Sequence, residues 1–231
     1  MSRPPIHNPR GVPVVGDDAH LPSVDPSRLS EPALRERFRQ LPDWVPEFRG
    51  DGALFVDHGP AQAAVLVGLV PRDGALRVLF TQRNAQLRKH AGQVSFPGGR
   101  SEAEDGGPTV TALREAHEEV GLEPARVDVL GAMPTYTTVT NFVVTPIVGI
   151  VQPPAAYKPD PREVDSVFEV PLAFLMTPAH HRRHRFEWDG NAREFLSMTW
   201  PGDGAADEEG ERFIWGATAA MLRNLYRLLS A

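Results

Sequence analysis

The chain has 231 residues, with 24 basic and 30 acidic side chains and a formal net charge of −6. This charge argues against nucleic acid as the main partner, because contact with a phosphate backbone usually needs a basic surface. The absence of cysteine excludes disulfide scaffolds, cysteine-ligated zinc and thiolate nucleophiles. No apolar run is long enough to span a membrane, and the first residues lack the apolar stretch of a signal peptide. We therefore expect a cytoplasmic protein whose partner is a small molecule, with neither nucleic acid nor a membrane; a homodimer stays open.

Three regions follow one another along the chain. Residues 1–27 are rich in Pro, Gly, Asp and His and show no periodicity, which predicts a flexible N-terminal arm that lies on the surface or stays disordered. Residues 28–58 are expected to form an N-terminal helix and a loop, with Ser30 as the cap of a helix over 31–40. Residues 59–231 are expected to form one compact domain, in which we find no internal repeat.

The compact domain alternates apolar strands with few helices. Apolar runs predict strands, and apolar residues at helical spacing predict helices. We expect strands over 61–70, 76–82, 127–133, 142–151 and 164–170, helices over 109–120, 171–176 and 216–229, and a hairpin within 186–200 that turns at Asp189 and Gly190. This series indicates an α/β or α+β sandwich.

The predicted helix over 109–120 carries a cluster of carboxylates. At about 100° per residue, Glu115, Glu118 and Glu119 fall in one sector, and apolar side chains such as Leu113 fall on the opposite side. One interpretation is a solvated acidic face. The other is a site for a hard cation, because Mg²⁺ prefers carboxylate oxygens and bridges to the phosphates of substrates.

The residues upstream of this helix favour the cation site. Gly98 and Gly99 suit a close approach of the backbone to a ligand. Cationic side chains that could contact phosphate oxygens are supplied by Arg83, Arg88, Lys89 and Arg100.

Residues 99–122 resemble the Nudix box, which is usually written G-x5-E-x7-R-E-U-x-E-E-x-G-U, with U apolar. Gly99 opens the box, and the sequence R-E-A-H-E-E-V-G-L at 114–122 completes it. The resemblance has two departures: Asp105 stands where Glu is expected, and eight residues rather than seven separate it from Arg114.

The preceding residues resemble the signature of the coenzyme A pyrophosphatase branch, L-L-T-x-R-[SA]-x3-R-x3-G-x3-F-P-G-G. Residues 79–99 here read L-F-T-Q-R-N-A-Q-L-R-K-H-A-G-Q-V-S-F-P-G-G. Phe80 replaces a Leu and Asn84 replaces the small residue, while the other fixed positions agree. The longer loop that contains Asp is also similar to that branch.

The resemblance implies an α/β/α sandwich with a mixed sheet and a catalytic set of Glu115, Glu118, Glu119 and Arg114. The three glutamates are then the ligands of Mg²⁺ or Mn²⁺, with Glu115 and Glu119 on the principal ion. Glu118 ligates a second ion or orients Arg114. The general base stays open between Glu118, Glu119 and a carboxylate from a later loop. The implied contacts with the substrate come from Arg83, Arg88, Gly98 and Gly99.

The activity implied by the resemblance is hydrolysis of the pyrophosphate bond of coenzyme A or acyl-coenzyme A, which gives 3′,5′-ADP and (acyl-)4′-phosphopantetheine. One alternative is another nucleoside diphosphate derivative such as ADP-ribose, against which the upstream signature argues. Another is a non-catalytic nucleotide sensor, which the intact carboxylate cluster disfavours. The basic run over 180–185, H-H-R-R-H-R, has two interpretations: a clamp for a 3′-phosphate or a metal site, and a solvated loop, which we favour because nothing fixes its geometry.

Overall fold

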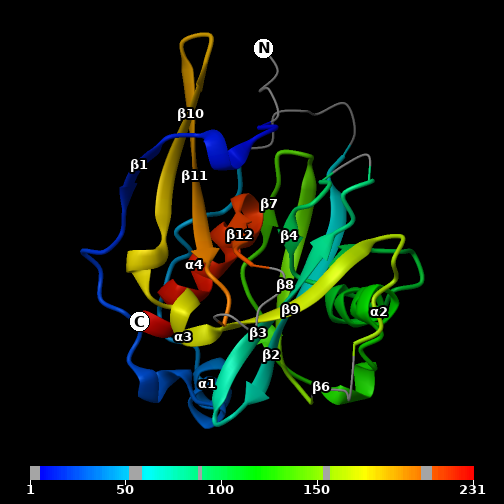
Figure 1. Ribbon diagram of the computed structural model, residues 1–231. Coiled ribbons are helices and arrows are strands. Elements are labelled where there is room, and N and C mark those ends of the chain that lie inside the picture. Colours follow the sequence, from blue (N-terminus) through cyan, green and yellow to red (C-terminus); the bar gives the residue numbers. More distant parts are fainter. Residues whose placement is uncertain (1–5, 52–58, 88–89, 153–156, 204–209) are drawn as a thin grey trace.

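The computed structural model describes residues 6–51, 59–87, 90–152, 157–203 and 210–231. In these residues the chain forms two β-sheets, and helices cover both faces of the larger one (Figure 1). The helices are α1 (Glu31–Arg39), α2 (Pro108–Val120), α3 (Leu172–Leu175) and α4 (Gly216–Ser230). No helix in this part of the chain has the length and apolar character needed to cross a membrane.

The larger sheet is mixed. Its strands are β2 (Ala61–Arg72), β3 (Ala75–Arg83), β4 (Val94–Ser95), β5 (Gly98–Arg100), β6 (Val127–Ala132), β7 (Tyr136–Thr137), β8 (Phe142–Val151) and β9 (Val164–Pro171). The two long central strands, β2 and β8, run parallel, whereas the other recorded pairs of this sheet are antiparallel. Strand β9 lies along β3 from Arg77 to Arg83.

Both faces of this sheet are buried, as the nearly continuous apolar runs of its central strands require. On one face, Leu79 of β3 packs in a cluster with Ala116 and Val120 of α2. On the other face, Phe80 packs in a second cluster with residues of α4 such as Leu222. Each fully buried Leu or Phe side chain stabilises the fold by about 1.5–3 kcal/mol. The layers are thus helix, sheet and helix, which confirms the predicted sandwich and its mixed sheet.

A second, smaller sheet was not predicted. It has the order β1–β10–β11–β12, from Val14–Asp17, Arg182–Trp188, Asn191–Trp200 and Arg212–Trp215. The predicted hairpin turn at Asp189 and Gly190 is confirmed, and both residues have positive φ.

The N-terminal segment contributes to this second sheet. Strand β1 pairs with β10, so part of the segment expected to be a flexible arm has a regular conformation. The partner strand, β10, lies far away in the sequence, and no local pattern predicts this pairing. The division into 1–27, 28–58 and 59–231 stays a prediction.

Candidate functional site

Helix α2 presents its three glutamates in three different environments. The helix begins at Pro108 and ends at Val120, and Gly121 follows in a left-handed conformation (φ 69°) that favours glycine. Only 3% of Glu119 is exposed, Glu115 is partly buried, and 57% of the Glu118 side chain is exposed. The expected polar face therefore turns one of its carboxylates towards the sheet.

Glu119 is held by the glycine loop and by Arg83. Its Oε2 accepts a hydrogen bond from the backbone N–H of Gly98 at 3.1 Å, and its Oε1 lies 3.4 Å from Arg83 Nη1. Burial raises the pKa of Glu119 to about 7, and the nearby charges of Glu115 and Glu163 act in the same direction. When Glu115 and Glu119 are both ionised, the site therefore has too little positive charge to compensate them.

Glu115 lies directly against the backbone of the glycine loop. A Cβ atom at Gly99 would come within 2.5 Å of the Glu115 carboxylate, so a larger residue there would displace that carboxylate. Gly98 has a φ of 153° and lies against the backbone of Ala64 and Val65 of β2, which leaves no space for a side chain. Burial raises the pKa of Glu115, and the neighbouring Arg114 opposes that shift.

Arg114 joins the loop to the helix. Its Nε and Nη2 donate to the two carboxylate oxygens of Asp105, each at 3.0 Å, and its Nη1 donates to Glu118 at 3.1 Å. Asp105 also accepts hydrogen bonds from Thr111 and from the backbone N–H of Glu102. The Arg114 guanidinium holds the pKa of Asp105 well below its usual range. The Asp at this departure from the box therefore fixes Arg114, and Glu118 contacts the same residue, while its role in orienting Arg114 stays a prediction.

The donor set suits a hard divalent cation. Carboxylate oxygens are the ligands that Mg²⁺ prefers, and a cation would stabilise the ionised forms of Glu115 and Glu119, whose pKa is raised mainly by burial. Within the described ranges, however, no group of three or more His, Asp or Glu side chains already converges on one point as a metal centre does. In this conformation Arg83 and Arg114 make the ionic contacts of the glutamates. The role of the three glutamates as metal ligands stays a prediction.

Glu163 is a neighbour of the cluster that the sequence did not single out. Its charge raises the pKa of both Glu115 and Glu119. Its backbone carbonyl accepts a hydrogen bond from Asn84 at 2.8 Å, next to the pairing of Val164 with Arg83. The position depends on the β3–β9 pairing, for which the sequence carries no local signal. Glu163 is therefore a candidate for the carboxylate from a later loop that could act as the general base.

Of the expected substrate contacts, Arg83, Gly98 and Gly99 all lie beside the carboxylates. Arg83 ends β3, and its buried Nε has no hydrogen-bond partner among the described residues. Arg88 lies outside the described residues, so its contact with a substrate stays a prediction.

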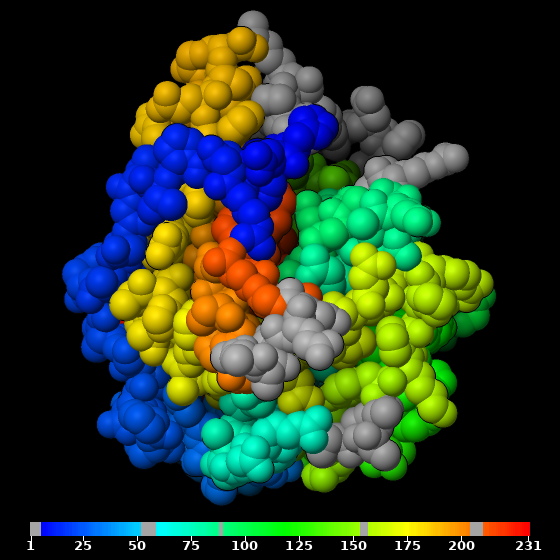
Figure 2. Space-filling model, in the orientation of Figure 1, coloured from blue at the N-terminus to red at the C-terminus, as the bar shows by residue number. Residues whose placement is uncertain are grey.

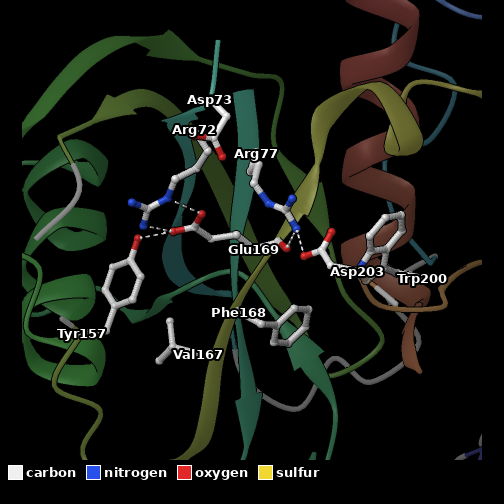
Figure 3. Close-up of a pocket in the computed structure, with 9 residues that line it drawn as sticks. All are labelled: Arg72, Asp73, Arg77, Tyr157, Val167, Phe168, Glu169, Trp200 and Asp203. Carbon is white, nitrogen blue, oxygen red and sulfur yellow. Dashed lines mark hydrogen bonds and ion pairs between the residues drawn. The ribbon is translucent and has the colours of Figure 1, made fainter. Parts of the chain in front are cut away.

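One cavity lies away from this cluster. It has a volume of about 490 Å³ and is located where β2 turns into β3, at the opposite end of β3 from Arg83 (Figure 3). Its charges are paired with one another: Arg72 makes two hydrogen bonds to Glu169, and Arg77 bonds to Asp203 at 2.6 Å. Because its cations are already neutralised, this cavity is poorly suited to an anionic substrate.

The basic run over 180–185 is not a solvated loop, so the interpretation that we favoured was wrong, while the clamp for a 3′-phosphate or metal site stays a hypothesis. His181 and His184 are buried, and most of the run belongs to β10. Arg183 forms a two-pronged ion pair with Asp18, at 2.9 and 3.0 Å. Because nearly all residues of this run are basic, the sequence did not reveal the alternation of a strand, in which His184 points inward and Arg185 outward.

Comparison with known proteins gives the family. A family model described as the NUDIX domain matches residues 60–189. NudL of Escherichia coli strain K12, named as an uncharacterized Nudix hydrolase, is 41% identical over 167 residues, which cover 71% of this chain and 80% of NudL. NudL of Citrobacter koseri is 42% identical over 165 residues, with the same coverage of 71% and 80%. The solved structure of a Nudix hydrolase from M. smegmatis, RenU, is 24% identical and covers 56% of this chain and 79% of its own, with a TM-score of 0.43. The chain therefore belongs to the Nudix hydrolase family.

Proposed function

We propose that this Nudix hydrolase cleaves the pyrophosphate bond of coenzyme A or acyl-coenzyme A, giving 3′,5′-ADP and (acyl-)4′-phosphopantetheine. One observation carries the proposal: residues of the coenzyme A-type signature, which precedes the helix in the sequence, contact its carboxylates directly. Arg83 and Gly98 both contact Glu119, and Gly99 makes room for Glu115. A signature that builds the wall of the site is well placed to select the substrate.

The proposed cofactor is Mg²⁺ or Mn²⁺, since Nudix hydrolases generally use divalent metals. Glu115 and Glu119 would hold it, and Glu118 would keep Arg114 in place. When bound, such an ion neutralises the diphosphate and lowers the pKa of a bound water. The rise in the pKa of Glu119 to about 7 through burial supports the proposal, because a carboxylate in that state gains from a nearby cation.

The remaining roles fall to cationic and acidic side chains around the cluster. Arg83 is proposed to donate to a phosphate oxygen from the part of its guanidinium that stays exposed beside Glu119. Arg88 is proposed to bind the phosphates from the same loop. Glu163 is proposed as the base that accepts a proton from the attacking water, and Glu119 is the alternative base.

A panel of substrates tests this function. The protein is incubated with Mg²⁺ or Mn²⁺ and with coenzyme A, dephospho-coenzyme A or ADP-ribose, and the products are separated by chromatography. We expect coenzyme A to give the highest kcat/KM. Dephospho-coenzyme A should be poorer, because loss of a paired phosphate leaves cationic side chains unsatisfied. If ADP-ribose is the best substrate, the coenzyme A proposal is wrong and the family assignment alone stands.

A further inference from the structure

A second cavity lies between the N-terminal segment and the loop that leads into the glycine motif. It has a volume of about 240 Å³. Six side chains that define its character are Asn8, Arg10, Gln82, Gln93, Glu211 and Trp215. In Figure 2 the blue N-terminal segment lies against the orange-red segment of β12, on the side that faces the blue-green segment before the glycine motif.

The N-terminal wall of this cavity is built into the fold. Arg10 forms an ion pair with Glu211, and its guanidinium lies 4.8 Å from the centre of the Phe213 ring. Just beyond, the carbonyl of Val12 is 2.9 Å from Nδ1 of the buried His184, and β1 then pairs with β10. These contacts fix the segment before β1 over β12.

The opposite wall is attached to the backbone of the carboxylate site. Gln82 Nε2 donates to the carbonyl of Gly92 at 2.9 Å, and Gln82 Oε1 accepts from Arg212 at 3.1 Å. The next residue, Arg83, exchanges backbone hydrogen bonds with the same loop: its N–H donates to Gln93 at 2.9 Å, and its carbonyl accepts from Gly92 at 3.1 Å. The side chain of Arg83 contacts Glu119. The cavity and the carboxylates therefore share one short stretch of β3 and its partner loop.

The chemistry of the lining selects a neutral, polar ligand. The formal charges of Arg10 and Glu211 cancel in their ion pair. The lining also includes the amides of Asn8, Gln82 and Gln93, the imidazole of His7 and the rings of Phe213 and Trp215. A phosphate would find no unpaired Lys or Arg among these residues, whereas amide groups and short apolar stretches would find matching partners.

We infer that this cavity binds the amide-bearing pantetheine arm of the substrate, which makes the N-terminal segment a specificity element. The inference rests on the proposed function, because it assumes that the scissile diphosphate carries such an arm. The diphosphate lies at Arg83 on the α2 face of the sheet, and Gln82 faces the cavity on the opposite face, so the arm passes round the end of β3 to enter the cavity. The positions of Gln82 and Gln93 are variable in the coenzyme A-type signature, so this site is additional to the signature.

The experiment fills the cavity. Ala91 lines it and is exposed, so Ala91→Phe should occupy the space without disturbing the core. Ala85→Phe is the matched control, since Ala85 is exposed in the same loop and does not line the cavity. Both variants are assayed on coenzyme A and on the methyl ester of 3′-phosphoadenosine 5′-diphosphate, which keeps the nucleotide and the diphosphate but lacks the arm. We expect Ala91→Phe to lower kcat/KM for coenzyme A at least tenfold and to leave that for the methyl ester within twofold of the wild type.

A binding measurement makes the outcome independent of the proposed activity. Pantetheine alone is titrated into the wild type and both variants and followed by ligand-observed NMR. Binding to the wild type and to Ala85→Phe but not to Ala91→Phe supports the inference, even if ADP-ribose turns out to be the better substrate. Equal loss of activity on both substrates, no loss on either, or pantetheine binding that Ala91→Phe leaves unchanged overturns it. Thermal unfolding of each variant shows whether the fold is retained.

Discussion

At the scale of single residues, the same side chain takes different properties from its surroundings. Burial raises the pKa of Glu119 to about 7, whereas Glu118, one position earlier, is largely exposed and pairs with Arg114. Glu115 lies between these extremes, against the backbone of Gly99. A string of three glutamates in the sequence is therefore a set of three distinct functional groups in the fold.

We expect Glu115→Gln and Glu119→Gln each to lower kcat by roughly a hundredfold or more, because a neutral amide is a poor ligand for Mg²⁺. Chelation of divalent metal should abolish wild-type activity. The fold should survive, since the amide has nearly the same shape and removes repulsion between carboxylates. Glu104→Gln, in the exposed loop before α2, is the control and should keep full activity. Near-normal turnover of either α2 variant at saturating Mg²⁺ would exclude that residue as a ligand.

Arg83 offers a second test at this scale. A charge-assisted hydrogen bond to phosphate contributes about 1.5–3 kcal/mol, so Arg83→Ala should lower kcat/KM by roughly ten- to a hundredfold. Arg83→Lys should rescue poorly, because an ammonium cannot reproduce the guanidinium fork. Arg88→Ala is expected to behave alike. Arg39→Ala, which removes an exposed arginine of α1, is the control. A lower melting temperature with unchanged kcat/KM would make Arg83 a structural residue only.

At the scale of elements, the glycine loop and α2 form one unit because Arg114 connects them. The two hydrogen bonds to Asp105 hold the loop against the first turns of the helix, and the Arg100 carbonyl accepts a third from Arg114. The short side chain of Asp105 reaches Arg114 across a loop that is one residue longer than in the usual box. Loop length and side-chain length thus compensate for each other.

This compensation predicts a rescue. Asp105→Glu alone should lower both kcat/KM and the melting temperature, because the longer side chain is displaced from Arg114 in a loop of unchanged length. Deleting Gly106 in the same chain restores the usual spacing of seven and should recover part of both losses. The Gly106 deletion without the Asp105 change is the control and should be the poorest of the three. If the double variant is no better than Asp105→Glu, loop length and side-chain length are not coupled.

The sequence predicted those elements whose signal is local and long. Helix α2 and the strands β2, β3 and β8 have extended apolar periodicity, and each was placed to within a few residues. Short strands such as β1 and β12 were missed, because four residues carry too little pattern and their stability comes from remote partners. The cavity beside the N-terminal segment could not be predicted for the same reason.

The candidate site divides in the same way. The three glutamates of α2 could be found because one contiguous motif carries them. The burial of Glu119 could not be found, since it depends on where the sheet lies relative to the helix. Glu163 could not be predicted as part of the site either, because it joins the cluster only through the pairing of β9 with β3.

At the scale of the whole molecule, one buried ionic network joins segments from both ends of the chain. Arg223 of α4 contacts Asp18 at 3.3 Å and Glu47 at 2.7 Å, and Arg183 of β10 bonds to the same two carboxylates. His181 completes the network: its Nδ1 is 3.1 Å from Arg223, and its Nε2 is 2.8 Å from the carbonyl of Leu175. Removing one partner of such a buried pair costs about 3–5 kcal/mol, because it leaves the other charge without compensation.

The network makes stability depend on pH through His181. Burial lowers the pKa of His181 from 6.5 to about 4, and the nearby charge of Arg223 acts in the same direction. Between these two values the unfolded chain binds a proton that the folded chain does not, so the free energy of unfolding falls as the pH drops from 6.5 towards 4. The full effect is at most roughly 3 kcal/mol, since each pKa unit corresponds to about 1.4 kcal/mol.

We expect His181→Gln to separate this contribution from the titration of the carboxylates. The variant should be less stable than the wild type at pH 7.5, because it disturbs the contact with Arg223, but it has no imidazole to protonate. The difference in the free energy of unfolding between wild type and variant should therefore shrink as the pH is lowered from 6.5 to 4, by an amount of up to roughly 3 kcal/mol. Urea unfolding at a series of pH values measures it. His7→Gln, in the exposed N-terminal segment, is the control, and its curve should stay parallel to that of the wild type. Parallel curves for His181→Gln would mean that this histidine titrates alike in the folded and unfolded chain.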